Sequence, residues 1–388
     1  MAIRAVRSRG HGSARRPVRV RRRSLTDRPL LRADCLVGAQ KALKRSVKRW
    51  FAPPLRRGCS IVPSPVRHHF ALILALTHGS SLWRGGTAPK TGPSFCTALP
   101  RVPVGAGCPL VHSHGPVPMA SPLDPRALLP QVRATVREAA LLALPFFRAG
   151  ERTTARVWSK SGGSPVTEAD VAVDTFLKIR LSELAPRAAW LSEETRDDPV
   201  RLAHDLVWIV DPIDGTRAFL SGDPDWSIAI ALLAEGEPVL GMVAAPVTGL
   251  LYEAVAGEGA RRNGEPIRVT DQADLARARV AGPKPMVDHL ERALGLGGTP
   301  DALVRLRRIP SLALRVARVA EGLVDVGLIS SDARDWDLAG ADLILREAGG
   351  AMLDLAGRVP SYNRREPVHG ELVAAPQSMQ AALLSAMR

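Results

Sequence analysis

The chain has 388 residues, enough for two domains and a large buried core, and its formal net charge is +15. The charge is uneven: residues 1–118 contain 22 Lys and Arg but only 2 Asp and Glu, whereas residues 119–388 contain 31 Lys and Arg and 36 Asp and Glu. This distribution excludes a uniformly basic protein, and we expect no nucleic-acid binding by residues 119–388.

Residues 1–118 show no sustained hydrophobic periodicity, and their prolines and glycines are scattered. This Arg-rich, acid-poor composition is typical of a nucleic-acid-binding arm, a targeting peptide, a disordered segment or a sequence outside the natural protein. The change of composition at Met119, just before an amphipathic helix, favours Met119 as the true start. The apolar run Phe70–His78 is too short to cross a bilayer, so we expect no transmembrane segment.

All the cysteines lie in this first segment, without the spacing of a zinc site or a disulfide framework (Cys35, Cys59, Cys96 and Cys108). The rest of the chain is therefore indifferent to the redox compartment, which suits the cytoplasm. We expect a cytoplasmic protein, with peripheral attachment to a membrane as the alternative.

Residues 119–285 are predicted to form an α+β half that contains the functional site. Its predicted elements follow from hydrophobic periodicity and turn residues. In chain order they are a helix from Ser121 or Asp124 to about Phe147, a helix over 168–184, strands over 188–195 and 205–211, and an antiparallel meander over 226–269 with turns at Gly236, Gly249 and Gly264.

Residues 286–388 are predicted to form a second half in which helices and strands alternate. The expected elements are a helix near 287–294, a strand near 302–307, helices near 312–321 and 337–347, a strand near 371–375 and a helix near 378–387. A sheet-and-helix half followed by an alternating half indicates a layered α/β (α+β) architecture.

Acidic residues stand at the ends of several predicted elements: Asp170, Glu193, Glu194, Asp211, Asp214 and Asp337. If these ends converge, like charges would raise one another's pKa unless a cation neutralised them. A hard divalent cation with oxygen ligands is the natural partner, and Mg²⁺ suits carboxylates combined with water and phosphate. No His or Cys accompanies the group, which argues against zinc.

The stretch "DPIDGT" adds a phosphate-binding feature to the acids. Pro212 fixes the backbone as part of a turn, so that the carbonyl of Ile213 can point to an ion held by the aspartates. Gly215 and Thr216 then offer backbone N–H groups at the start of a short helix, an arrangement that binds phosphate. Together these features predict metal-assisted phosphoryl transfer to water, with the Thr216 hydroxyl and Asp170 activating the water.

Each feature also has a plainer interpretation. "DPIDGT" alone is compatible with an ordinary aspartate-rich turn, and "SEET" with a solvated helix start. Asp337 alone is compatible with a helix cap. The specificity comes from the occurrence of four features in one order: Asp170 in "SPVTEAD", the glutamates of "LSEET", the aspartates of "DPIDGT" and Asp337 in "DWD".

In that order, "SPVTEAD … LSEET … WIVDPIDGTRAF … DWDLAGADLILREAGG" resembles the inositol monophosphatase superfamily of Mg²⁺-dependent, lithium-sensitive phosphomonoesterases. The resemblance covers nearly all of residues 119–388 and none of residues 1–118. It implies a five-layered α-β-α-β-α sandwich, two or three bound Mg²⁺ ions and a small phosphorylated metabolite as substrate. A homodimer is compatible with the sequence, which does not give the oligomeric state.

The resemblance also assigns roles to individual residues. It implies that Glu193 bridges metals and that the remaining metal ligands are Asp211, the Ile213 carbonyl, Asp214 and Asp337. Water activation falls to Asp170 with Thr216 in the bisphosphate nucleotidase branch and to Glu194 in the inositol branch. The implied substrate-binding residues are Glu193, Ile213, Asp214, Gly215, Thr216, Asp337 and Lys160, although Lys160 is equally compatible with an ordinary loop lysine.

Substrate choice depends on two further stretches. Inositol phosphatases usually have a glutamate shortly before "WD", where this chain has Ser330, Ser331 and Asp332. The motifs look more like bacterial 3'(2'),5'-bisphosphate nucleotidases, which act on adenosine 3',5'-bisphosphate from sulfate assimilation. Inositol monophosphate and, because of "DGTRAF", histidinol phosphate remain alternatives. Arg217 is interpreted as a contact to a second phosphate or as a surface arginine. A basic nucleic-acid-binding protein with a structural ion is the non-enzyme alternative.

Overall fold

The computed structural model describes residues 123–160, 163–296 and 303–388. The predictions for residues 1–118, together with Met119 as the start and Ser121 as a cap, lie outside these residues. No helix among the described residues is long and apolar enough to cross a membrane.

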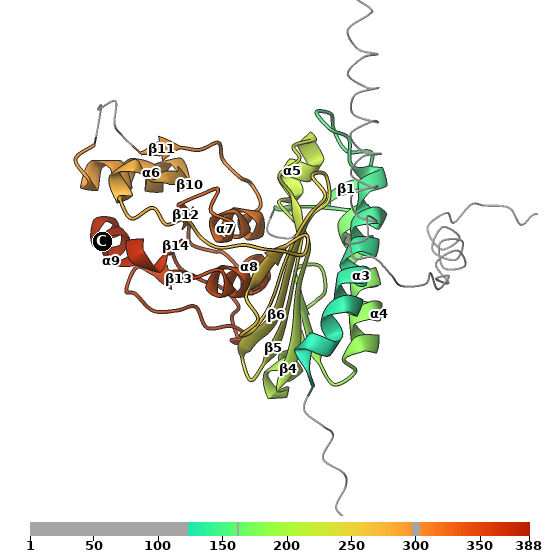
Figure 1. Ribbon diagram of the computed structural model, residues 1–388. Helices are drawn as coiled ribbons and strands as arrows, with labels where there is room; N and C mark the ends of the chain where they lie inside the picture. The colour runs from blue at the N-terminus through green and yellow to red at the C-terminus, as the bar shows by residue number, and fades with distance from the viewer. Residues whose placement is uncertain (1–122, 161–162, 297–302) are drawn as a thin grey trace, which may run out of the picture. The chain divides into compact units, whose positions relative to one another are not determined.

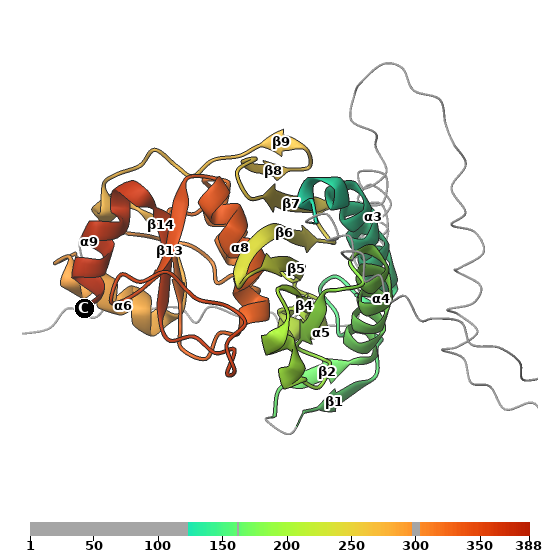
Figure 2. The same cartoon turned by 90° about the horizontal axis from the view of Figure 1, so that it is seen from below.

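The described residues form five layers, as Figures 1 and 2 show. Helices α3 (Pro125–Ala143) and α4 (Glu168–Leu184) cover one face of a seven-stranded sheet. Helices α7 (Leu312–Ala320) and α8 (Asp335–Glu347) lie between that sheet and a five-stranded one, and α6 (Lys284–Ala293) and α9 (Gln377–Met387) cover its outer face. The predicted α-β-α-β-α sandwich is confirmed.

The seven-stranded sheet has the order β3-β4-β5-β6-β7-β8-β9. Its strands are Ala189–Ser192, Leu206–Asp214, Ser227–Ala234, Glu237–Ala245, Leu250–Val255, Ala260–Arg262 and Glu265–Pro266. Only the first pair is parallel; β5 to β9 form the predicted antiparallel meander, and β4 pairs antiparallel with β5. Gly236, Gly249 and Gly264 adopt the left-handed backbone conformation at the predicted turns. A separate hairpin, β1 (Val157–Ser159) and β2 (Pro165–Thr167), precedes α4.

The five-stranded sheet has the order β11-β10-β12-β14-β13. Its strands in that order are Val304–Arg305, Arg279–Ala281, Val326–Ile329, Leu372–Pro376 and Gly350–Asp354. The predictions missed β10, β12 and β13, because runs of three to five residues show too little alternation to be distinguished from loops. β10 belongs to this sheet although it precedes residue 285. The division of residues 119–388 at that residue stays a prediction.

Several helices begin as the sequence predicts, and local contacts explain why. Residues 168–184 form α4, whose N-cap Thr167 and N3 residue Asp170 make a capping box. The buried side of α3 repeats at helical spacing through Val132, Val136 and Ala139, and a 3-10 helix over Leu144–Phe146 continues it to the predicted end.

Two glycines let α8 approach the seven-stranded sheet closely. A Cβ on Gly340 would lie 2.4 Å from the Ile230 carbonyl oxygen, and one on Gly241 would lie 2.4 Å from the Gly340 carbonyl oxygen. No larger residue fits at either position without a shift of the backbone. The contact brings the first turn of α8 close to the sheet.

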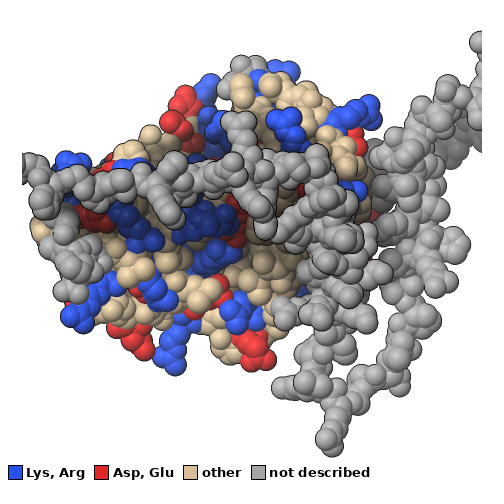
Figure 3. Space-filling view, turned by 90° about the horizontal axis from the view of Figure 1, so that it is seen from above, with Lys and Arg blue, Asp and Glu red and all other residues tan. Residues whose placement is uncertain are grey.

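Lys and Arg side chains gather on one face of the molecule, as Figure 3 shows. This is the side on which the short helix α5 (Thr216–Ser221) and β11 lie in Figure 1. Residues 305, 307 and 308, in and just after β11, are exposed arginines on this part of the chain.

Candidate metal centre

Three of the predicted carboxylates converge. Asp211 and Asp214 lie on β4 and Asp337 lies in the first turn of α8, and one carboxylate oxygen from each is within 4.8 Å of the other two. Asp211 and Asp214 are buried, with 1% and 5% exposure. The donor set is therefore a compact group of carboxylate oxygens, which suits a hard cation.

An irregularity in β4 explains how two residues three apart reach one point. Asp211 pairs with Ala229 and Asp214 pairs with Ser227, so β4 has one extra residue between them. Side chains of a regular strand alternate between faces, and residues three apart would point to opposite sides. The extra residue re-aims one side chain. β4 thus continues through Pro212 to Asp214, whereas the prediction placed a turn there.

Asp214 is held by the start of α7. Its carboxylate accepts hydrogen bonds from the Ser311 hydroxyl at 2.6 Å, the Ala313 amide at 2.8 Å and the Leu312 amide at 3.2 Å. Gly215 follows in the left-handed conformation, where a Cβ would lie 3.2 Å from the Ser311 nitrogen. Glycine is therefore required beside this contact. The sequence reasoning missed Ser311, whose local signal was that of a helix N-cap.

The buried acids disfavour one another's ionisation. Burial raises the pKa of Asp211 well above its usual range, and the charges of Glu193, Asp214 and Asp337 raise it further. Burial and the charges of Asp214 and Glu193 act likewise on the pKa of Asp337. Burial also raises the pKa of Asp214 to about 6, against the effect of its hydrogen bonds to α7. A cation among these oxygens would remove this penalty.

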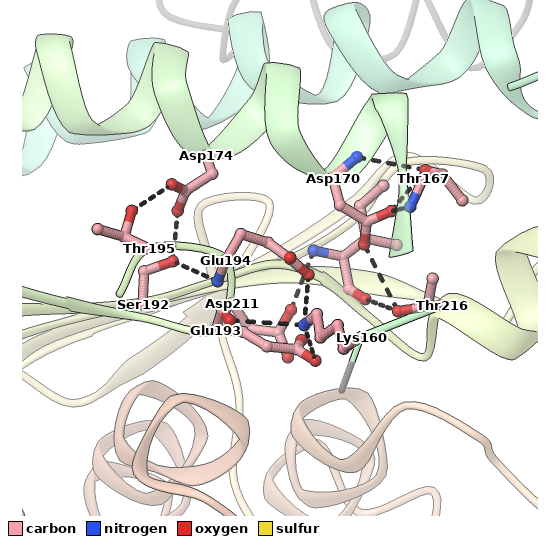
Figure 4. Close-up of polar contacts among 11 residues, drawn as sticks. Lys160, Thr167, Asp170, Asp174, Ser192, Glu193, Glu194, Thr195, Asp211 and Thr216 are labelled. Atoms are coloured by element: carbon pink, nitrogen blue, oxygen red, sulfur yellow. Dashed lines mark hydrogen bonds and ion pairs between the residues drawn. The ribbon is translucent and has the colours of Figure 1, made fainter. Parts of the chain in front are cut away.

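Glu193 and Glu194 follow β3 and meet Lys160, which directly follows β1 (Figure 4). The Lys160 ammonium lies 2.8 Å from a carboxylate oxygen of each glutamate. Burial lowers the pKa of Lys160, but the two carboxylates outweigh it and the net shift is upward. Burial raises the pKa of Glu194 to about 7, although Lys160 opposes the shift. These contacts leave "SEET" half-buried at the site, and its interpretation as a solvated helix start is wrong.

Asp170 is fully buried at the start of α4 and accepts hydrogen bonds from the amide and hydroxyl of Thr167. Burial raises the pKa of Asp170 to about 6, despite these hydrogen bonds. The Thr216 hydroxyl lies 3.5 Å from an Asp170 oxygen and 3.2 Å from the Ile213 carbonyl oxygen. The predicted pair Thr216 and Asp170 thus lies close together, but the 3.5 Å between the two oxygens is longer than the range of about 2.5–3.0 Å for an ordinary O–H···O hydrogen bond.

Of the remaining residues, Asp337 belongs to the carboxylate group, whereas those considered for substrate choice are exposed. Asp337 combines both of its interpretations, because one oxygen accepts the Arg334 amide at 2.7 Å as a helix cap while the side chain belongs to the carboxylate group. Arg217 is exposed on α5, and Ser330, Ser331 and Asp332 are exposed after β12.

Comparison with known proteins agrees with this geometry. Residues 128–388 match the model of the inositol monophosphatase family. The chain is 31% identical over 214 residues to a 3'(2'),5'-bisphosphate nucleotidase of Aggregatibacter actinomycetemcomitans (53% of this chain, 78% of the relative). It is 33% identical over 226 residues to inositol monophosphatase 3 of Solanum lycopersicum (57% and 84%) and 31% identical over 258 residues to a histidinol-phosphatase of Chlorobaculum parvum (64% and 92%).

The fold has solved counterparts. The extragenic suppressor protein SuhB of Bartonella henselae superposes with a TM-score of 0.59 at 26% identity, over 68% of this chain and 98% of that protein. Residues 128–388, which match the family model, make up most of the layered sandwich.

Proposed function

The chain belongs to the inositol monophosphatase family of phosphatases, and we propose that it is a Mg²⁺-dependent phosphomonoesterase that removes the 3'-phosphate of adenosine 3',5'-bisphosphate. The observation that carries the metal-dependent part of this proposal is the convergence of Asp211, Asp214 and Asp337 within 4.8 Å. These carboxylates, with Glu193 and the Ile213 carbonyl, would hold two or three Mg²⁺ ions. Bound Mg²⁺ would neutralise charge on the phosphate and favour attack by water.

The residues around this group have distinct roles in the proposal. The backbone amides of Gly215, the N-cap of α5, and of Thr216, its first residue, have no acceptor within the helix and would bind the phosphate. Asp170 is ionised above its pKa of about 6 and takes a proton from water through the Thr216 hydroxyl. Glu194 is the alternative acceptor of that proton, and Lys160 lies where it can bind a phosphate oxygen as well as the glutamates.

Two arginines support a substrate with a second phosphate. Arg217 directly follows Thr216, and Arg308 lies three residues before Ser311; both are exposed. Neither makes a hydrogen bond or an ion pair with another described residue. By contrast, Asp288 and Glu291 engage Arg305, and Asp223 and Asp225 engage Arg307. Guanidinium groups without an acidic partner, on residues close in sequence to Thr216 and Ser311, favour a second anionic group, which adenosine 3',5'-bisphosphate has and the alternative substrates lack.

The test is a panel of phosphate esters assayed side by side for kcat/KM with Mg²⁺ and with EDTA. The panel contains adenosine 3',5'-bisphosphate, inositol 1-phosphate and histidinol phosphate. We expect Mg²⁺-dependent phosphate release, with the bisphosphate preferred. A preference for either monophosphate would refute the proposed substrate, and salt-sensitive DNA binding without phosphate release from any ester would favour the non-enzyme alternative.

Arginine variants sharpen the substrate test. Replacing Arg217 and Arg308 together by Gln should lower kcat/KM for the bisphosphate by about tenfold or more while changing the monophosphate values much less. The matched control is Arg305→Gln, which removes an exposed arginine that acids already engage. If kcat/KM falls equally for all three esters, Arg217 and Arg308 do not determine which substrate is preferred.

A further inference from the structure

A buried carboxylate outside the predicted site accepts hydrogen bonds from the segment that carries Glu193 and Glu194. Asp174 lies on α4, one turn after Asp170, and is only 5% exposed. One of its oxygens accepts a hydrogen bond from the Ser192 hydroxyl, and the other accepts one from the Thr195 hydroxyl at 2.6 Å. Figure 4 shows the two hydroxyls reaching the same carboxylate from either end of the turn.

These contacts fix the turn at both ends and in the middle. Ser192 and Thr195 flank the two glutamates in sequence, and the Ser192 hydroxyl also accepts the Glu194 amide at 3.3 Å. The Thr195 hydroxyl in turn accepts the Trp190 indole N–H at 3.3 Å. The backbone of the turn is thus tied to β3 and to α4.

The same helix holds a second site carboxylate. Residues four apart on a helix share a face, so Asp170 and Asp174 point to the same side of α4. Because Asp174 holds the turn that carries Glu193 and Glu194, it sets the position of that turn relative to Asp170. Three carboxylates of the proposed site, Asp170, Glu193 and Glu194, therefore depend on one helix for their spacing.

Attachment alone does not require a carboxylate here. Burying a carboxylate costs free energy unless it is hydrogen-bonded, and this one adds negative charge to a region already rich in acids. An apolar contact would join α4 to the turn at lower cost. Hydrogen bonds from hydroxyls to a carboxylate add direction, because each requires a defined angle and distance. Both oxygens of Asp174 accept hydrogen bonds from the two hydroxyls. Asp174 therefore influences Glu193 and Glu194 through the turn that carries them.

We propose that Asp174 is a positioning residue that orients Glu193 and Glu194 for metal binding and water activation. The proposal rests on the roles proposed above for those glutamates. Removing a partner that orients a metal ligand typically weakens metal affinity or activity by about 10- to 100-fold. The effect should appear in Mg²⁺ affinity and kcat rather than in KM, because Asp174 does not reach the substrate.

The test compares variants at the two ends of the hydrogen bond between Thr195 and Asp174; the Thr195 hydroxyl also accepts the Trp190 indole N–H. Asp174→Asn removes the charge and one acceptor, Thr195→Val removes a hydroxyl at nearly constant shape, and Thr195→Ser retains the hydroxyl. Mg²⁺ binding is measured by titration calorimetry on the full chain, together with kcat and KM. We expect Asp174→Asn and Thr195→Val to weaken Mg²⁺ binding by about tenfold or more and Thr195→Ser to match the wild type.

A remote carboxylate provides the control. Asp325 is 1% exposed and accepts hydrogen bonds from the Arg279 amide and guanidinium, which join β10 to the turn before β12. Asp325→Asn should lower the melting temperature but leave Mg²⁺ binding unchanged. In the double variant Asp174→Asn/Thr195→Val the losses of Mg²⁺ affinity should not add, because both substitutions break the hydrogen bond between Asp174 and Thr195.

The measurements of Mg²⁺ binding test the positioning role of Asp174 independently of whether the proposed reaction occurs. Unchanged Mg²⁺ binding in Asp174→Asn and Thr195→Val would overturn the positioning role, whatever their turnover. If Asp174→Asn fails to fold, the comparison of Thr195→Val with Thr195→Ser still decides. A wild-type chain that binds Mg²⁺ but cleaves no ester would refute the proposed function, while the binding comparison would still test Asp174.

Discussion

Replacing Asp211 by Asn is expected to stabilise the metal-free protein at pH 8 and to abolish phosphate release. Asp211 is 1% exposed, and its carboxylate lies within 4.8 Å of carboxylate oxygens of Asp214 and Asp337. The Asp211 carboxylate accepts a hydrogen bond from the Ile213 amide at 3.0 Å, and the side-chain oxygen of Asn can accept it equally well. The substitution therefore removes a repelling charge with little loss of bonding.

The size of such a penalty can be given for the neighbouring acid, Asp214. The pKa of Asp214 is raised from 3.8 to about 6. A shift of about two units corresponds to about 3 kcal/mol of stability. Because the pKa is higher in the folded state, this stability is fully present below pH 3.8 and is lost as the pH rises to about 6. Burial and neighbouring charges raise the pKa of Asp211 in the same direction, so Asp211→Asn should raise the unfolding free energy by at least about 1 kcal/mol at pH 8 and change it little near pH 4.

Urea unfolding in EDTA at pH 4.5 and pH 8 measures the effect as the difference in unfolding free energy between the variant and the wild type. Mg²⁺ should reverse the order at pH 8, because ligand binding to the folded state stabilises the wild type more than the variant. Asp325→Asn is the control and should lose stability at both pH values. If Asp211→Asn is less stable than the wild type at pH 8 in EDTA, electrostatic repulsion among these acids does not govern the stability of the metal-free site.

Four further outcomes are expected from the site and its surroundings. Asp214→Asn should abolish turnover and leave a folded protein by circular dichroism; a near-normal rate would show that the metal lies elsewhere. Deletion of residues 1–118 should leave kcat/KM unchanged, and a folded product with a large loss would contradict this. kcat/KM should decline below pH 6 as Asp170 takes up a proton, which a pH–rate profile would show. Arg133→Met should cost about 3–5 kcal/mol in urea unfolding, because it leaves Glu253, 2% exposed, without its partner at 2.7 Å, and Glu253→Gln should restore most of the loss.

The sequence predicts the acids of this site but not what holds them. Motif order, through the family resemblance, was sufficient to bring together Asp211, Asp214 and Asp337, which are up to 126 positions apart in the numbering. Ser311 contacts Asp214 across 97 residues, and Thr195 contacts Asp174 across 21. A lone Ser before a helix or a Thr after "SEE" has no local pattern that reveals such a partner, because the contact depends on tertiary packing.

The irregularity in β4 could not be predicted from the sequence either. The extra residue between Asp211 and Asp214 is defined only by the register with β5, which the sequence of β4 alone does not contain. The turn predicted at Pro212 was an understandable alternative, since Pro and Gly usually interrupt strands. What the structure adds is that the strand continues, and that this continuation brings the two aspartates to one side.

Three helix N-termini meet the acids, and this explains how the fold buries them. Asp170 and Asp337 are the N3 residues of α4 and α8, and each accepts a backbone amide at its helix start. Asp214 accepts the amides of the first two residues of α7. The partial positive charge of a helix N-terminus stabilises a carboxylate by about 0.3–2 kcal/mol. The pKa of Asp214 is nevertheless raised to about 6 with its hydrogen bonds to α7 in place, so the contacts at the helix start do not offset the effect of burial. The helices therefore orient the carboxylates without neutralising them, and the remaining charge is left for a cation.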